Sequence, residues 1–181
     1  MLSIVIPSVE LWDEKKEEFV YTKERTLQLE HSLVSVAKWE AKWNKPFINK
    51  KDKTQAEIID YVRCMTITQN VPDDCYNYLT IENIEQVNQY IALPMTATWF
   101  TETKKKTSIN REQITAELIY YWMISFNIPM ECQKWHLNRL LTLIRVFNEK
   151  NKPKKKMSRQ ELYRQHAAIN AANRKKFNSK G

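Results

Sequence analysis

Apolar and polar residues alternate along the first part of the chain in a pattern that predicts a small antiparallel β-sheet. Leu2–Ile6 is short and rich in β-branched residues. Phe19–Thr22 and Thr26–Glu30 are separated by the polar residues 23–25, so we predict that they form a hairpin. Two or three strands are marginally stable alone, and we therefore expect this sheet of residues 2–31 to pack on helices.

The apolar positions then change to a helical period with recognisable start signals. Ser32 is placed to cap a helix over 32–45, which ends before a proline. Thr54 and Glu57 have the spacing of a capping box in front of a second helix over 55–66. The sequence therefore predicts two amphipathic helices directly after the sheet.

Two more helices are predicted before Pro94. Pro72 suits the first turn of a short helix that runs to Tyr78. Thr80 is placed to cap the next helix, whose apolar positions recur up to Ile91.

The most apolar segment of the chain is residues 118–124. We predict that it lies in a helix that begins at Ser108 or Asn110. Because this segment has no polar face, we expect it to be buried centrally. Pro129 is predicted to begin the last helix of the body, and the two long helices would then form an antiparallel pair at the centre of the core.

Together these elements predict an α+β fold that is mostly α, with a small N-terminal hairpin or sheet, a helical bundle and a basic C-terminal helix. The predicted organisation is one globular domain over 1–149 (β over 2–31, helices over 33–148), a basic linker over 150–157 and a basic helical tail over 158–181.

The positive charge of the chain is concentrated in this tail. The whole chain has a net charge of +8, and from Lys150 to Gly181 eleven Lys and Arg residues face a single acid, Glu161. Ser158 and Glu161 form a second predicted capping box, but the apolar stripe behind it is thin. Three interpretations remain open: a solvated end, a docking arm for an acidic protein partner, or a phosphate-binding segment. The candidate partner-binding residues are Lys152, Lys154, Lys155, Lys156, Arg159, Arg164, Arg174, Lys175 and Lys176.

A second candidate surface is the pair Trp39 and Trp43, which lie one helical turn apart with lysines beside them. Aromatic and basic side chains together can stack nucleic-acid bases. The favoured interpretation is that the two indoles cover the core while the lysines reach water.

Composition excludes several kinds of catalytic or nucleotide-binding site. The chain has one glycine, at its last position, so Gly-rich phosphate loops and glycine-flanked nucleophile elbows are excluded. Three cysteines without CxxC spacing are expected to be reduced thiols. Neither a signal peptide nor an apolar run long enough for a membrane span is recognised, and we expect an intracellular protein without a membrane partner.

Few residues are candidates for catalysis or metal binding. Cys132 and His136 are four residues apart and would face the same side of a helix, but a packed thiol and a hydrogen-bonded histidine are favoured over a nucleophile or half of a metal site. Asp73 and Asp74 are interpreted as first-turn acids that complement a helix dipole. We therefore predict a protein that is not an enzyme, with no catalytic residue, metal ligand or cofactor.

Several segments resemble a known family. They are Glu30–Glu40 (EHSLVSVAKWE), Met95–Phe100 (MTATWF), Ile114–Met123 (ITAELIYYWM), Trp135–Arg145 (WHLNRLLTLIR) and the ending Asn170–Lys176 (NAANRKK) before a terminal Lys-Gly. With these segments the chain is similar to the tail assembly chaperones of tailed bacteriophages.

The resemblance implies a helical protein in the host cytoplasm that binds the tape measure protein and keeps it soluble while tail tube subunits polymerise around it. It offers no catalytic motif. The alternatives are a structural virion, tail-associated or connector protein, and a nucleic-acid-binding module that uses the basic tail. The oligomeric state remains open.

Overall fold

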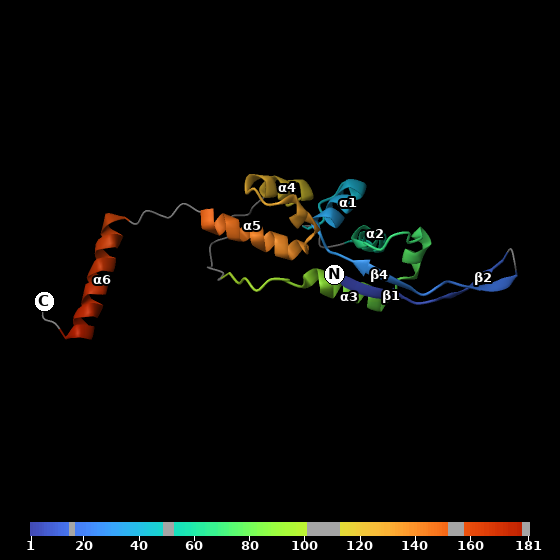
Figure 1. Cartoon of the computed structure of the whole chain (residues 1–181), viewed down its shortest axis with the longest axis horizontal. Helices are drawn as coiled ribbons and strands as arrows, with labels where there is room; N and C mark the ends of the chain where they lie inside the picture. The colour runs from blue at the N-terminus through green and yellow to red at the C-terminus, as the bar shows by residue number, and fades with distance from the viewer. Residues whose placement is uncertain (15–16, 49–52, 101–112, 152–157, 179–181) are drawn as a thin grey trace. The chain divides into compact units, whose positions relative to one another are not determined.

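The N-terminal segment of the computed structural model forms two antiparallel strand pairs (Figure 1). Strand β1 (Leu2–Ile6) pairs with β4 (Arg25–Leu29), and β2 (Glu10–Asp13) pairs with β3 (Glu18–Tyr21). The Val9 N–H donates to the Thr22 hydroxyl at 2.7 Å, and the Thr22 N–H donates to the Val9 carbonyl at 2.9 Å. These two bonds join the strand pairs into one ribbon.

The structure describes residues 1–14, 17–48, 53–100, 113–151 and 158–178. The fold is α+β and mostly helical, as predicted. The chain forms two compact units, Met1–Phe147 and Asn148–Gly181.

The predicted hairpin between Phe19–Thr22 and Thr26–Glu30 is wrong, because each of these segments pairs with a different strand. In the β1–β4 register Ile4 lies opposite Leu27, and both side chains are buried. This pairing places the alternating apolar residues of both strands on the core face, and a slip of one residue would turn them to solvent. The side chains of β3 are all exposed, and its partner β2 was not predicted.

Three helices of the first unit begin at the predicted caps. They are α1 (Leu33–Trp43), capped by Ser32, α2 (Gln55–Met65), capped by Thr54, and α3 (Ile81–Ala92), capped by Thr80. Between α2 and α3 lies a 3₁₀ helix, η1 (Asp73–Tyr78), which follows Pro72. In each α-helix the hydroxyl of the cap residue accepts from the backbone N–H three residues on, which fixes the residue at which the helix begins.

Helix α4 (Ala116–Ser125) begins later than predicted. Its N-cap is Thr115, and residues 113–115 are not helical; Ser108 and Asn110 lie outside the described residues. Helix α4 is also not central, because Tyr121 and Ile124 are exposed although its opposite side is buried against α1. An apolar sequence all round a helix does not determine which of its sides meets a partner.

Pro129 does not begin the last helix of the body. It precedes a 3₁₀ helix, η2 (Met130–Lys134), and α5 runs over Leu137–Asn151. The Leu137 N–H donates to the His31 carbonyl at 2.7 Å, and this long-range bond interrupts the expected continuous helix. Helix α5 also includes Lys150 and Asn151, which were predicted to lie in the linker; residues 152–157 are outside the described part of the chain.

Helix α1 occupies the centre of the core, where the α4–α5 pair was predicted. Its residues Leu33, Val36 and Trp39 are completely buried. Its Glu40 is also buried, and the carboxylate accepts two backbone hydrogen bonds, from the Phe47 N–H at 2.6 Å and from the Ala116 N–H at 2.7 Å. One side chain of α1 thus holds both the segment that follows α1 and the first residue of α4.

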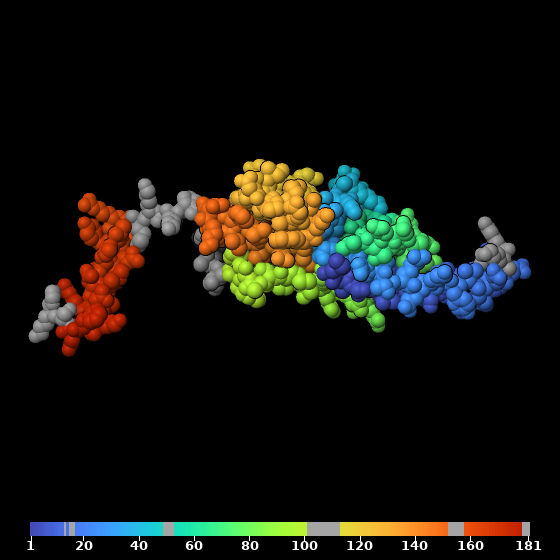
Figure 2. All heavy atoms as spheres, in the orientation of Figure 1, coloured from blue at the N-terminus to red at the C-terminus, as the bar shows by residue number. Residues whose placement is uncertain are grey.

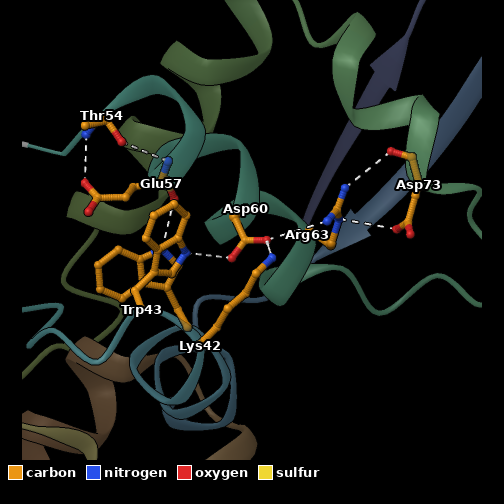
Figure 3. Close-up of polar contacts among 8 residues, drawn as sticks. Lys42, Trp43, Thr54, Glu57, Asp60, Arg63 and Asp73 are labelled. Atoms are coloured by element: carbon orange, nitrogen blue, oxygen red, sulfur yellow. Dashed lines mark hydrogen bonds and ion pairs between the residues drawn. The ribbon is translucent and has the colours of Figure 1, made fainter.

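A row of ionic contacts joins α1 to α2 and η1 (Figure 3). Asp60 accepts from the Lys42 ammonium and, at 2.9 Å, from the Trp43 indole N–H. Arg63 lies 3.6 Å from Asp60 and 3.4 Å from Asp73. Asp73, predicted as a first-turn acid, therefore also ties η1 to α2.

Replacing Glu40 with Gln should lower the free energy of unfolding by about 2–3 kcal/mol, because a neutral amide offers only one acceptor to two buried N–H donors. Chemical denaturation measures this change. Glu85→Gln on the exposed side of α3 is the matched control and should change stability by less than about 0.5 kcal/mol. Equal effects of the two substitutions would show that the two hydrogen bonds of Glu40 do not stabilise the fold.

Candidate functional site

The predicted basic helix of the tail is present as α6 (Arg159–Phe177) in the second unit. Its capping box is confirmed: the Ser158 N–H donates to Glu161 Oε2 at 2.9 Å, and the Glu161 N–H donates to Ser158 Oγ at 3.2 Å. The backbone and hydroxyl of Ser158 hold the pKa of Glu161 below its ordinary value. At the other end, Asn178 adopts the left-handed conformation that terminates a helix.

Every residue of α6 is exposed, including the apolar side chains of Leu162, Ile169 and Phe177. A helix that buries no face of its own is marginally stable and depends on its caps and end charges. Glu161 in the first turn and the three cations of the last turn complement the helix dipole. The helix is therefore stabilised by its own caps and end charges. Its apolar side chains are exposed within the described residues.

The structure places five of the predicted partner-binding residues on this helix: Arg159, Arg164, Arg174, Lys175 and Lys176. The other four, Lys152, Lys154, Lys155 and Lys156, lie outside the described residues. Successive helical residues are turned by about 100°, so Arg174, Lys175 and Lys176 point in three different directions. The cations therefore surround α6 and do not form the single row that would follow a phosphate backbone.

One side of α6 carries two apolar side chains, Leu162 and Ile169, and two polar ones, His166 and Asn173. Leu162, His166, Ile169 and Asn173 are spaced at i, i+4, i+7 and i+11, which places them on one side of the helix. This spacing is typical of a helix face that packs against another helix.

The tryptophan pair of α1 belongs to the core. Trp39 is completely buried, and its Nε1–H donates to the Glu57 carbonyl at 2.9 Å. Trp43 is half-buried and bonded to Asp60, and the two indoles are stacked with centroids 6.1 Å apart. These contacts confirm the core interpretation and leave no exposed stacking surface at Trp39.

The expectation that Cys132 and His136 share one helix face is wrong. Cys132 lies in η2, and His136 lies between η2 and α5. The imidazole of His136 contacts the ring of His31 instead, with centroids 5.1 Å apart, and its Nε2 lies 3.1 Å from the Tyr90 carbonyl. The extended backbone at His136, which pairs with Ser32, directs the side chain toward β4 and α3.

Sequence reasoning missed the buried polar cluster that these two histidines form. His31 Nδ1 shares a hydrogen bond with the Tyr61 hydroxyl, which also lies 3.4 Å from Ser35 Oγ. Burial and the neighbouring His136 lower the pKa of His31 to about 3, and burial also lowers the pKa of His136. Both imidazoles are therefore neutral near pH 7. His31 and His136 are too far apart in the sequence for any local pattern to predict their contact. Each histidine lies just before the start of a helix, α1 or α5.

An apolar cavity of about 300 Å³ adjoins this cluster. It is lined by side chains of α2, α3 and α5 and by the segment after α1. Its polar lining includes His31 and Asn138, and the Asn138 amide already donates to the Ile91 and Leu93 carbonyls at 2.8 Å. The contacts of His31 and His136 thus connect the end of β4 and the start of α5 to helices α2 and α3.

No protein-family model, curated protein or solved structure matches the chain. Within the described ranges, His, Cys, Asp and Glu side chains do not gather in groups of three or more that could hold a metal ion. In that same part of the chain, no helix has the length and apolar character needed to cross a membrane.

Lowering the pH should destabilise the body through His31. The unfolded histidine has a pKa of about 6.5, whereas burial holds it near 3 in the folded protein. Between these values the unfolded state binds more protons, so stability is fully present above pH 6.5 and is lost as the pH falls, by about 1.4 kcal/mol per pH unit for one such group.

Urea unfolding between about pH 4 and pH 7 measures this slope. His31→Gln should reduce it by about 1 kcal/mol per pH unit. The exposed His166 of α6 supplies the control, since His166→Gln should leave the slope unchanged. The same slope in both variants would show that His31 is not the titrating group.

Proposed function

We propose that this protein is a tail morphogenesis factor of a tailed bacteriophage, an assembly chaperone that binds the tape measure protein through α6. The resemblance of five sequence segments to tail assembly chaperones motivates the choice of partner. The observation that carries the proposal is the capped, fully exposed helix α6, whose apolar face lies among cations.

The chemistry of α6 indicates what kind of partner segment it would bind. Leu162 and Ile169 are 43% and 48% exposed, so burial of the exposed part of each side chain contributes about 1 kcal/mol, which suits a helix–helix contact of low to moderate affinity. The surrounding cations would attract an acidic amphipathic helix and accelerate its association. A long helical client that must be kept from aggregating presents segments of this type.

The marginal stability of α6 suits a transient interaction. Part of the binding energy is used to order the helix, so the complex is weaker than one between preformed surfaces. A chaperone must release its client when tail tube subunits arrive, and a moderate affinity permits this.

Leu162→Ser combined with Ile169→Ser should reduce co-purification of the co-expressed tape measure protein at least about tenfold, because both apolar contacts are lost. Ala168→Ser combined with Ala171→Ser, on other sides of α6, is the matched control and should retain binding. Pull-down with quantitative gel densitometry measures the difference. Absence of co-purification with the unaltered protein would contradict the proposal.

Removal of residues 152–181 should abolish partner binding and leave the unfolding free energy of the body within about 0.5 kcal/mol, because α6 buries no residue. Circular dichroism and denaturant titration test the body.

Mass spectrometry of purified virions separates the chaperone from the alternative of a structural virion protein, since a chaperone is absent from mature particles. Salt-sensitive binding of duplex DNA by the unaltered protein, lost on removal of the tail, would instead favour the nucleic-acid alternative.

A further inference from the structure

The β2–β3 part of the N-terminal ribbon exposes an aromatic surface. Trp12 and Phe19 lie directly opposite each other in the strand register and make an edge-to-face contact with centroids 4.9 Å apart. Tyr21 follows on the same face, since it lies two residues after Phe19. The exposed fractions of the three side chains are 53%, 60% and 66%.

This surface is held in place but has no partner within the described residues of the body. The β1–β4 part of the ribbon is anchored in the core by Ile4, Ile6, Leu27 and Leu29, whereas every described side chain of β3 is exposed. Figure 2 shows this part of the ribbon as a projection from the first unit. An isolated two-stranded tip with exposed aromatic residues is marginally stable, and exposed apolar groups of this kind mark binding surfaces.

The sequence of the β2–β3 segment is acidic, and Glu10 lies on the aromatic face because it pairs with Tyr21, whereas Glu18, one residue from Phe19, lies on the opposite face. Residues 10–18 contain five acids and two lysines. Glu10 accepts a hydrogen bond from the Tyr21 hydroxyl, so one carboxylate is held at the edge of the aromatic face. Helix α6 has the opposite character, with five cations, one acid and an exposed apolar face.

We propose that the β2–β3 tip of one copy of this protein binds α6 of a second copy. Leu162 and Ile169 would pack on Trp12 and Phe19, and the cations of α6 would face the acids of the ribbon or the indole ring. A strand of four residues spans about 13 Å and matches two to three turns of α6. The contact joins two different surfaces, so each bound copy retains one free tip or one free helix and assembly continues head to tail.

This self-association goes beyond the proposed function and does not rest on it. Ribbon variants leave α6 intact, so they remove self-association without removing the surface that is proposed to bind the tape measure protein.

Sedimentation velocity of the full chain tests the proposal through complementation. The ribbon variant is Trp12→Ser with Phe19→Ser, and the helix variant is Leu162→Ser with Ile169→Ser. The unaltered protein should associate with increasing concentration, and each variant alone should weaken this at least about tenfold. A 1:1 mixture of the two variants should form a heterodimer and stop there, because one intact tip meets one intact helix.

The matched control is Ile81→Ser with Ile124→Ser, which removes two exposed apolar side chains outside both surfaces and should leave association unchanged. A second variant uses charge: Glu10→Lys, at the edge of the aromatic face, should weaken association because it places a cation opposite the cations of α6. Association should also weaken between about 50 mM and 300 mM salt.

Three results would overturn the proposal. They are an unaltered protein that stays monomeric at all concentrations, variants that associate as the unaltered protein does, and a mixture of the two variants that fails to form the heterodimer. Circular dichroism of each variant verifies the fold, which the exposed positions of the substituted side chains should preserve.

Discussion

The buried carboxylate of Glu40 is the constraint on which the arrangement of the body depends. A charged group inside a core is tolerated only when it is hydrogen-bonded, and here it accepts the backbone N–H groups of Phe47 and Ala116. These donors come from segments far apart in the chain. The carboxylate therefore holds both the segment that follows α1 and the first residue of α4 against α1.

The polar groups buried in the body form hydrogen bonds that hold its elements together. Glu40 braces the C-terminal half of α1, while His31 and Tyr61 form a neutral pair near its N-terminus, next to His136. Exposed apolar residues lie on the β2–β3 tip and on α6, and others lie on the rest of the body, at Ile81, Trp99, Tyr121 and Ile124. Strand β3 and helix α6 bury none of their residues, so a molecule bound there would not disturb the core.

Local signals in the sequence correctly predicted four helix starts, but not those of α4 and α5. Ser32, Thr54, Thr80 and Ser158 cap helices as expected, because a capping hydroxyl bonds an N–H only three residues away. The basic candidate residues on α6 were also found from composition alone. The buried cluster of His31 and His136 was not, because the two residues approach only when β4 and the start of α5 pack together.

The sequence by itself determined the fold class, most of the helices and the concentration of positive charge in the tail, since these depend on composition and on contacts within a few residues. Tertiary structure decided which strands pair, which side of α4 is covered and where α5 begins. The pairing of β4 with β1 places Leu27 opposite Ile4 in the core, whereas Leu137 meets the His31 carbonyl across the fold. Such choices depend on which distant groups can be buried or hydrogen-bonded together, and no local pattern contains that information.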